Sequence, residues 1–221
     1  MKKWIAILLA GMMLFGFAAC KSEPKEPEQT EPETAAVGGW TRPESMAVTD
    51  EVQELVVKAT ESLLGVDYAP VALIGTQLVS GTNYRVVCKA TAVAPDAKAF
   101  YAILEIYQKL DGSVECTKIL TSEAEAHATD AALAGGWSAP EGFAVSDEAR
   151  AALEKAAEKK LGASYTPVAL LGQQVVSGMN YAILCEIAPV TPNAESSFAV
   201  VTVYADLTGG AEITEIADFA A

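Results

Sequence analysis

The sequence contains one segment twice, and this duplication restricts the chain to folds that are built from two equivalent halves. Gly38-Gly39-Trp40 recurs as Gly135-Gly136-Trp137, from position 38 to position 135, which is an offset of 97 residues. The copies align without a gap, and about four positions in ten are identical. A solenoid would need shorter and more numerous units. We therefore predict two small tandem domains, at 38–123 and 135–221, joined by a linker at 124–134.

The sequence pattern of each copy predicts one helix followed by an antiparallel meander of strands. Thr49 and Ser146 are typical N-caps, and acidic residues follow them. Apolar residues then recur at helical spacing, and Gly65 and Gly162 are placed to end the helices in a left-handed conformation. Such a helix can bury its apolar stripe only against the inner face of the sheet. The predicted fold class is α+β, with one long helix packed in a curved antiparallel sheet in each domain. The predicted strands are 70–79, 83–93, 100–110 and 114–120 in the first copy, with 198–207 and 211–217 among those of the second.

The first 20 residues have the pattern of a bacterial secretion signal. Lys2 and Lys3 precede an uncharged apolar stretch from Trp4 to Phe17, and the chain becomes polar directly after Cys20. Phe17-Ala18-Ala19-Cys20 resembles a lipobox, in which the cysteine is lipidated and becomes the first mature residue. The alternative is a transmembrane anchor, but the stretch is shorter than the ~20 residues of a spanning helix. We expect an exported protein, lipid-anchored through Cys20 to the bacterial cell membrane or outer surface.

The segment 21–37 and the overall charge indicate a tethered, acidic protein. The segment repeats Pro, Glu and Thr without apolar periodicity, so it is expected to remain an extended tether. The chain has 29 acidic and 15 basic residues, a net charge of −14. Nucleic-acid binding needs clustered Lys and Arg to neutralise phosphates, and this balance argues against it.

The sequence offers no set of catalytic residues. His127 is the only histidine and lies between the copies, so no Ser-His-Asp, Cys-His or metal-binding set can be assembled. We therefore expect no enzyme activity, no cofactor and no metal. Cys88, Cys116 and Cys185 fall in apolar strands and are expected to be free thiols. A Cys88–Cys116 disulfide is the alternative, although an intervening strand would separate the two by ~9–10 Å, beyond disulfide reach.

The first predicted hairpin tip of each copy carries the same motif, Gln77-Leu78-Val79-Ser80-Gly81 and Gln174-Val175-Val176-Ser177-Gly178, and an x-Asn-Tyr follows each. A double glycine, a helix and then this Gln-x-Val-x-Gly tip, in that order, resemble the cystatin family, whose first hairpin tip has the same motif. The double glycines resemble the N-terminal glycines of that family. One departure concerns the second tip, where many secreted cystatins carry Pro-Trp but this chain has "LDGS" and "LTGG".

The resemblance implies a surface-anchored inhibitor that inserts a wedge into the active-site cleft of papain-like cysteine proteases. A glycine at a tip permits close approach to a foreign backbone, so Gly81→Glu and Gly178→Glu are expected to block binding without disturbing folding. The alternative is a non-inhibitory binding, adhesion or scaffold lipoprotein. The implied protease-binding residues are Gly38, Gly39, Gln77, Leu78, Val79, Ser80 and Gly81, with Gly135, Gly136, Gln174, Val175, Val176, Ser177 and Gly178 in the second copy.

The linker suggests that the copies act separately. Residues 121–134 are rich in Ala, Glu and Thr and offer no apolar surface that would fix one domain on the other. We therefore expect a monomer whose two domains fold and inhibit independently, with two proteases bound per chain.

Overall fold

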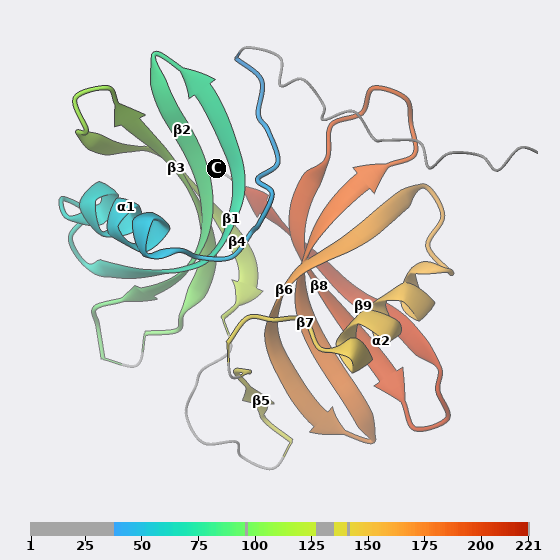
Figure 1. Ribbon diagram of the computed structural model, residues 1–221. Helices are drawn as coiled ribbons and strands as arrows, with labels where there is room; N and C mark the ends of the chain where they lie inside the picture. The colour runs from blue at the N-terminus through green and yellow to red at the C-terminus, as the bar shows by residue number, and fades with distance from the viewer. Residues whose placement is uncertain (1–37, 96, 127–134, 141, 221) are drawn as a thin grey trace, which may run out of the picture. The chain divides into compact units, whose positions relative to one another are not determined.

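Each repeat folds as a short helix followed by four antiparallel strands (Figure 1). The computed structural model describes residues 38–95, 97–126, 135–140 and 142–220. The predicted signal peptide, Cys20, the tether and His127 lie outside these ranges. The first repeat contains α1 (Asp50–Thr60), β1 (Val66–Val79), β2 (Gly81–Ala92), β3 (Phe100–Lys109) and β4 (Val114–Glu125). The second contains β5 (Trp137–Ser138), α2 (Asp147–Ala157), β6 (Ala163–Val176), β7 (Gly178–Pro189), β8 (Ser197–Asp206) and β9 (Ala211–Ala220).

The helices begin where the sequence predicts and end earlier. Thr49 Oγ1 accepts a hydrogen bond from Val52 N at 3.3 Å, and Ser146 Oγ accepts one from Ala149 N at 3.2 Å, so both N-caps are confirmed. Each helix has only 11 residues. Gly65 and Gly162 do adopt the predicted left-handed backbone, with φ angles of +89° and +101°. They are wrong as helix ends, because the buried stripe of α1 ends at Ala59 and the next residues are largely exposed. Without apolar burial, another helical turn gains little stability.

The predicted α+β fold class, with a long helix in each of two tandem domains, is also wrong. The described strands form one antiparallel sheet of nine strands, in the order β1-β2-β3-β4-β9-β8-β7-β6-β5. The repeats join where β4 pairs with β9, through Thr121 with Ala220 and Ser122 with Phe219. Both strands run past their predicted ends, and their unpaired backbone groups satisfy each other there.

One face of the sheet packs against the helices. In Figure 1, α1 and α2 each lie against the strands of their own repeat. Beneath α1, Val56 contacts a cluster that includes Val86, Cys88, Leu104 and Ile106. The equivalent cluster beneath α2 comprises Ala149, Ala152, Leu153, Ala156, Leu170, Tyr181, Ile183, Cys185, Val201, Val203 and Ala211.

The opposite face forms a core that both repeats share. Tyr101 in β3 is buried and donates a hydrogen bond from its hydroxyl to the Leu171 carbonyl of β6 at 3.2 Å. Arg42 forms an ion pair with Glu186 of the second repeat at 2.6 Å. The buried residues of this shared core are Val71, Ala72, Ile74, Val87, Tyr101, Ile103 and Ala126 from the first repeat, with Ala169, Leu171, Ala182, Leu184 and Val200 from the second.

The shared core contradicts the expectation of independent domains. The described part of both repeats belongs to one compact unit. The surface that fixes one repeat on the other is supplied by the strands themselves and not by the linker. Stretches such as "VVCKA" in β2 and "FYAILEIY" in β3 carry apolar residues at both alternating positions, a pattern typical of strands that are buried on both faces.

Candidate functional site

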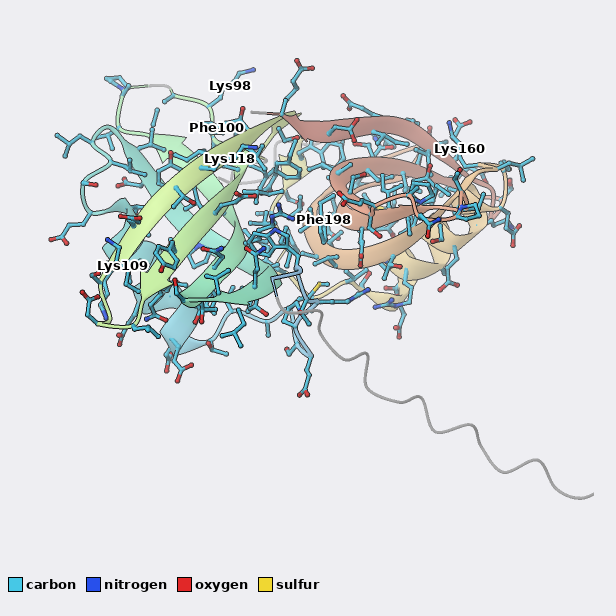
Figure 2. The ribbon with its side chains drawn as sticks, turned by 90° about the horizontal axis from the view of Figure 1, so that it is seen from above. Lys98, Phe100, Lys109, Lys118, Lys160 and Phe198 are labelled. Carbon is cyan, nitrogen blue, oxygen red and sulfur yellow. The ribbon has the colours of Figure 1, made fainter. Side chains whose placement is uncertain are left out.

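Three segments meet at one end of each repeat. The first hairpin closes with Val79 opposite Gly81, and the register of β2 with β3 places Gly81 opposite Lys109, at the start of the second hairpin tip. Lys109 is labelled at that tip in Figure 2. The N-terminal segment joins them because Thr41 N and Thr76 N each donate to the carbonyl of the other residue, at 2.7 and 2.9 Å. We call these regions the binding ends: 38–40, 78–81 and 110–112 in the first repeat, and 135–137, 175–178 and 207–209 in the second.

The glutamine of each motif holds its own binding end together. Gln77 Nε2 donates to the Gly38 carbonyl at 2.7 Å, and Gln77 Oε1 accepts from Asn83 Nδ2 at 2.6 Å. The second repeat repeats both bonds, at 2.8 and 2.6 Å, with Gln174, Gly135 and Asn180. The side-chain amides are therefore engaged within the protein. Their role here is to position the double-glycine segment beside the tip.

The motif glycines are required by the fold. Gly81 and Gly178 are buried and have φ angles of +143° and +141°. A Cβ at Gly81 would overlap the Gln108 carbonyl oxygen, and a Cβ at Gly178 would overlap the Ala205 carbonyl oxygen. The expectation that Glu at either position leaves folding intact is therefore wrong.

Two tyrosines that the sequence interpretation did not include stabilise the first tips. The Tyr107 hydroxyl donates to the Ser80 carbonyl at 2.9 Å, and the Tyr204 hydroxyl donates to the Ser177 carbonyl at 2.8 Å. The sequence signal that could have indicated this role is that tyrosine occupies the equivalent position in both copies. Because each bond links β3 or β8 to the tip of the preceding hairpin, it fixes the tip against its neighbour.

The second tips are closed by aspartates. Asp111 Oδ1 accepts hydrogen bonds from the Ser113 hydroxyl at 2.7 Å and from Ser113 N at 2.9 Å. Asp206 Oδ1 accepts from Thr208 Oγ1, Thr208 N and Gly210 N at 2.6, 2.7 and 2.9 Å. The serine and threonine hydroxyl bonds, followed by the backbone bonds, hold the pKa of each carboxyl below its usual value. Both tips therefore have defined structures without the Pro-Trp of many secreted cystatins.

Exposed apolar side chains gather at the binding ends. Leu78 is 71% exposed and Leu110 is 86% exposed, while their equivalents Val175 and Leu207 are 66% and 83% exposed. Val79 and Val176 are partly exposed beside them. All three positions are apolar in both copies, as are the exposed pairs Leu64 with Leu161 and Val93 with Val190 elsewhere on the surface. The apolar side chains at the binding ends are the accessible part of the predicted site.

The tryptophan after each double glycine anchors the N-terminal segment. Trp40 packs over Gly75, and the Arg85 guanidinium lies 3.9 Å from the centre of its ring. Arg85 is held in turn by Glu105, at 2.8 Å between Nη2 and Oε1. Trp137 packs against the shared core. Sequence reasoning missed Arg85 because the second copy has Ala182 at the equivalent position.

A hollow of about 490 Å³ lies beside the tips of the second repeat. It opens between α2 and both hairpin tips, and its apolar lining includes Val175, Met179 and Leu207. At the equivalent place in the first repeat, Thr82 replaces Met179 and Gln108 replaces Ala205. The two binding ends therefore share their framework and differ in the polarity of the surface behind the tips.

The cysteines of the described chain are unsuited to nucleophilic chemistry. Cys88, Cys116 and Cys185 are free, which confirms the prediction for these residues. Burial raises the pKa of the Cys185 thiol to about 12. Burial, with a smaller contribution from the nearby Cys116, also raises the pKa of the Cys88 thiol. The nucleophilic form is the thiolate. Within the described ranges there is also no group of His, Cys, Asp and Glu side chains that could hold a metal ion.

Comparison with known proteins adds no family assignment. No protein-family model matches the chain, and no curated protein matches it. The helices in the described ranges are too short or too polar to cross a membrane.

Proposed function

We propose that this protein is a surface-anchored inhibitor of papain-like cysteine proteases, with each binding end acting as a wedge. The observation that carries the proposal is the convergence, in both repeats, of the double-glycine segment with two hairpin tips that expose apolar side chains. The motif resemblance to cystatins supplies the class of partner. Export and lipid anchoring through Cys20 belong to the same proposal and rest on the sequence pattern.

The construction of the binding ends suits insertion into a narrow cleft. Val79 lies directly opposite Gly81, so the first hairpin ends in a tight tip with Ser80 at its apex. The glutamine bridge and the Tyr107 bond fix this tip before any partner arrives. Binding then orders little additional chain, which preserves affinity for a small contact area. The apolar side chains of Leu78 and Leu110 supply area that a partner can bury.

A titration of papain tests the proposal. The chain from residue 21 onward is added to papain, and cleavage of a fluorogenic peptide is followed. We expect inhibition by the wild type and a loss of at least 100-fold in affinity when Leu78→Glu and Val175→Glu are combined. Leu64→Glu with Leu161→Glu is the matched control, because Leu64 and Leu161 are also exposed but lie just before β1 and β6, away from the tips. Equal inhibition by both double variants would contradict the wedge.

A second candidate function is adhesion or scaffolding without inhibition. It is favoured by the second tips, where "LDGS" and "LTGG" lack the aromatic residue that many secreted cystatins present. In this case the same apolar tips bind a partner surface that is not an active-site cleft. The papain titration separates the candidates, because a scaffold protein leaves cleavage of the peptide unchanged at every concentration.

A further inference from the structure

The junction between the repeats relates them by an approximate two-fold axis. Ser122 pairs with Phe219, and these residues occupy equivalent positions because 219 − 122 equals the repeat offset of 97. An antiparallel pairing of equivalent residues is the arrangement found at an isologous dimer interface. The shared core agrees with this relation, since Ala72 and Ala169, and Val87 and Leu184, are equivalent pairs within it. The duplicated chain therefore resembles a dimer closed within one polypeptide.

This relation directs the binding ends away from each other. β4 starts directly after the second tip of its repeat, at Val114, and β9 starts directly after the other second tip, at Ala211. The two strands pair antiparallel through their far ends. At ~3.3 Å per residue, the length of β4 from Thr121 back to its start beside one binding end is ~23 Å. The length of β9 from Ala220 back to its start beside the other binding end is ~30 Å. The tips are thus separated by roughly 50 Å of strand.

We infer that one chain holds two partner proteases at the same time, facing away from each other, as a rigid bridge. This inference rests on the proposed function. A globular partner of ~200 residues has a radius of gyration of about 17 Å, so two such partners fit on ends ~50 Å apart without overlapping. The rigidity comes from the shared core, the Tyr101–Leu171 hydrogen bond and the Arg42–Glu186 ion pair, because these fix one repeat on the other.

The experiment measures both the stoichiometry and the geometry of the complex. The chain from residue 21 onward is mixed with papain whose active-site thiol carries a small alkyl cap, which prevents proteolysis. Light scattering after size exclusion gives the mass of the complex, and small-angle X-ray scattering gives the distance between the bound papain molecules. Leu78→Glu and Val175→Glu, alone and combined, block one end, the other end or both. Leu64→Glu with Leu161→Glu is the control for an added surface charge.

We expect two papain molecules on the wild type and the control, one on each single variant and none on the combined variant. The centres of the two papain molecules should lie on the order of 80–90 Å apart, from the tip separation plus twice the radius of gyration of a partner. If each single variant binds one papain and the wild type also binds only one, the ends exclude each other and the bridge is wrong. Two bound molecules with centres within ~50 Å would overturn the opposed geometry. Absence of any binding would overturn the proposed function together with this inference.

Discussion

The glycine of each Gln-x-Val-x-Gly motif serves the fold, so its replacement should act on stability before it acts on binding. We predict that Gly81→Ala destabilises the chain by about 3 kcal/mol or more, because a left-handed backbone and overlap with the Gln108 carbonyl oxygen add together. Gly112→Ala is the control. Gly112 has a φ of +84°, but a Cβ there meets nothing within 4 Å, so only about 1–2 kcal/mol should be lost. Urea denaturation measures both, and equal losses would contradict the overlap.

The hydroxyl of Tyr107 should matter more for binding than for folding. Tyr107→Phe removes the hydrogen bond to the Ser80 carbonyl and should cost about 0.5–1.5 kcal/mol of stability. Because the tip loses its lateral support, papain affinity at the first repeat should fall several-fold when the second repeat is blocked by Val175→Glu. Tyr84→Phe removes a comparable hydroxyl bond, to Gln108 Oε1 at 3.1 Å, that does not reach the tip. The prediction is wrong if both variants weaken binding equally.

The buried thiols should make the fold sensitive to alkaline pH. Burial raises the pKa of Cys185 to about 12, whereas a thiol in the unfolded chain ionises near ~8.5. A raised thiol pKa contributes stability that is complete below ~8.5 and is lost as the pH rises toward 12. Between these limits Cys185 should lower the free energy of unfolding by about 1.4 kcal/mol per pH unit. Urea denaturation at pH 8 to 10.5 measures this slope. In Cys185→Ala the slope should fall by that amount, whatever the absolute stability.

The N-terminal segment is attached to each hairpin by few interactions, and the glutamine bridge is central among them. Gln77→Leu removes the bond to the Gly38 carbonyl and leaves Asn83 without its partner. We expect faster amide hydrogen exchange at Thr41 and Thr76, whose mutual bonds close the segment onto β1, and little change in α1. Hydrogen exchange followed by NMR gives both rates. Unchanged exchange at Thr41 would show that Trp40 alone holds the segment.

The sequence predicted the local elements better than their assembly. N-caps at Thr49 and Ser146, and the strands around the hairpins, depend on neighbouring residues and were predicted closely. The helix length was not predicted correctly, because the end of α1 depends on where its burial against the sheet stops. The pairing of Thr121 with Ala220 is also a long-range property, since it requires two strand ends 99 positions apart to meet. For the site, the spacing of the motifs predicted where the tips lie. The Tyr107 hydrogen bond and the burial of Gly81 could not be predicted in this way, because both depend on the register of β2 with β3.

The shared core implies that the whole molecule folds as one cooperative unit, contrary to the behaviour of two separate domains. A repeat expressed alone would expose buried residues such as Leu171 and Tyr101 to water, so the halves should depend on each other. The chain from residue 21 onward offers a direct measurement, because it contains one tryptophan in each repeat, Trp40 and Trp137, while the third tryptophan is Trp4. In Trp137→Phe the fluorescence follows the first repeat, and in Trp40→Phe it follows the second.

We predict that urea unfolding followed by fluorescence and by circular dichroism gives one transition in each tryptophan variant. The decisive measurement uses Leu171→Ala. This substitution leaves a cavity in the second repeat, on the side of the shared core and not beneath α2. It should destabilise the fold by about 2–5 kcal/mol. The loss should appear equally in the Trp40 signal of the other repeat, since that repeat cannot stay folded without its covering partner. A Trp40 transition that stays at its original urea concentration, while the Trp137 transition moves, would mean that the repeats unfold separately and that the bridge between the binding ends is flexible.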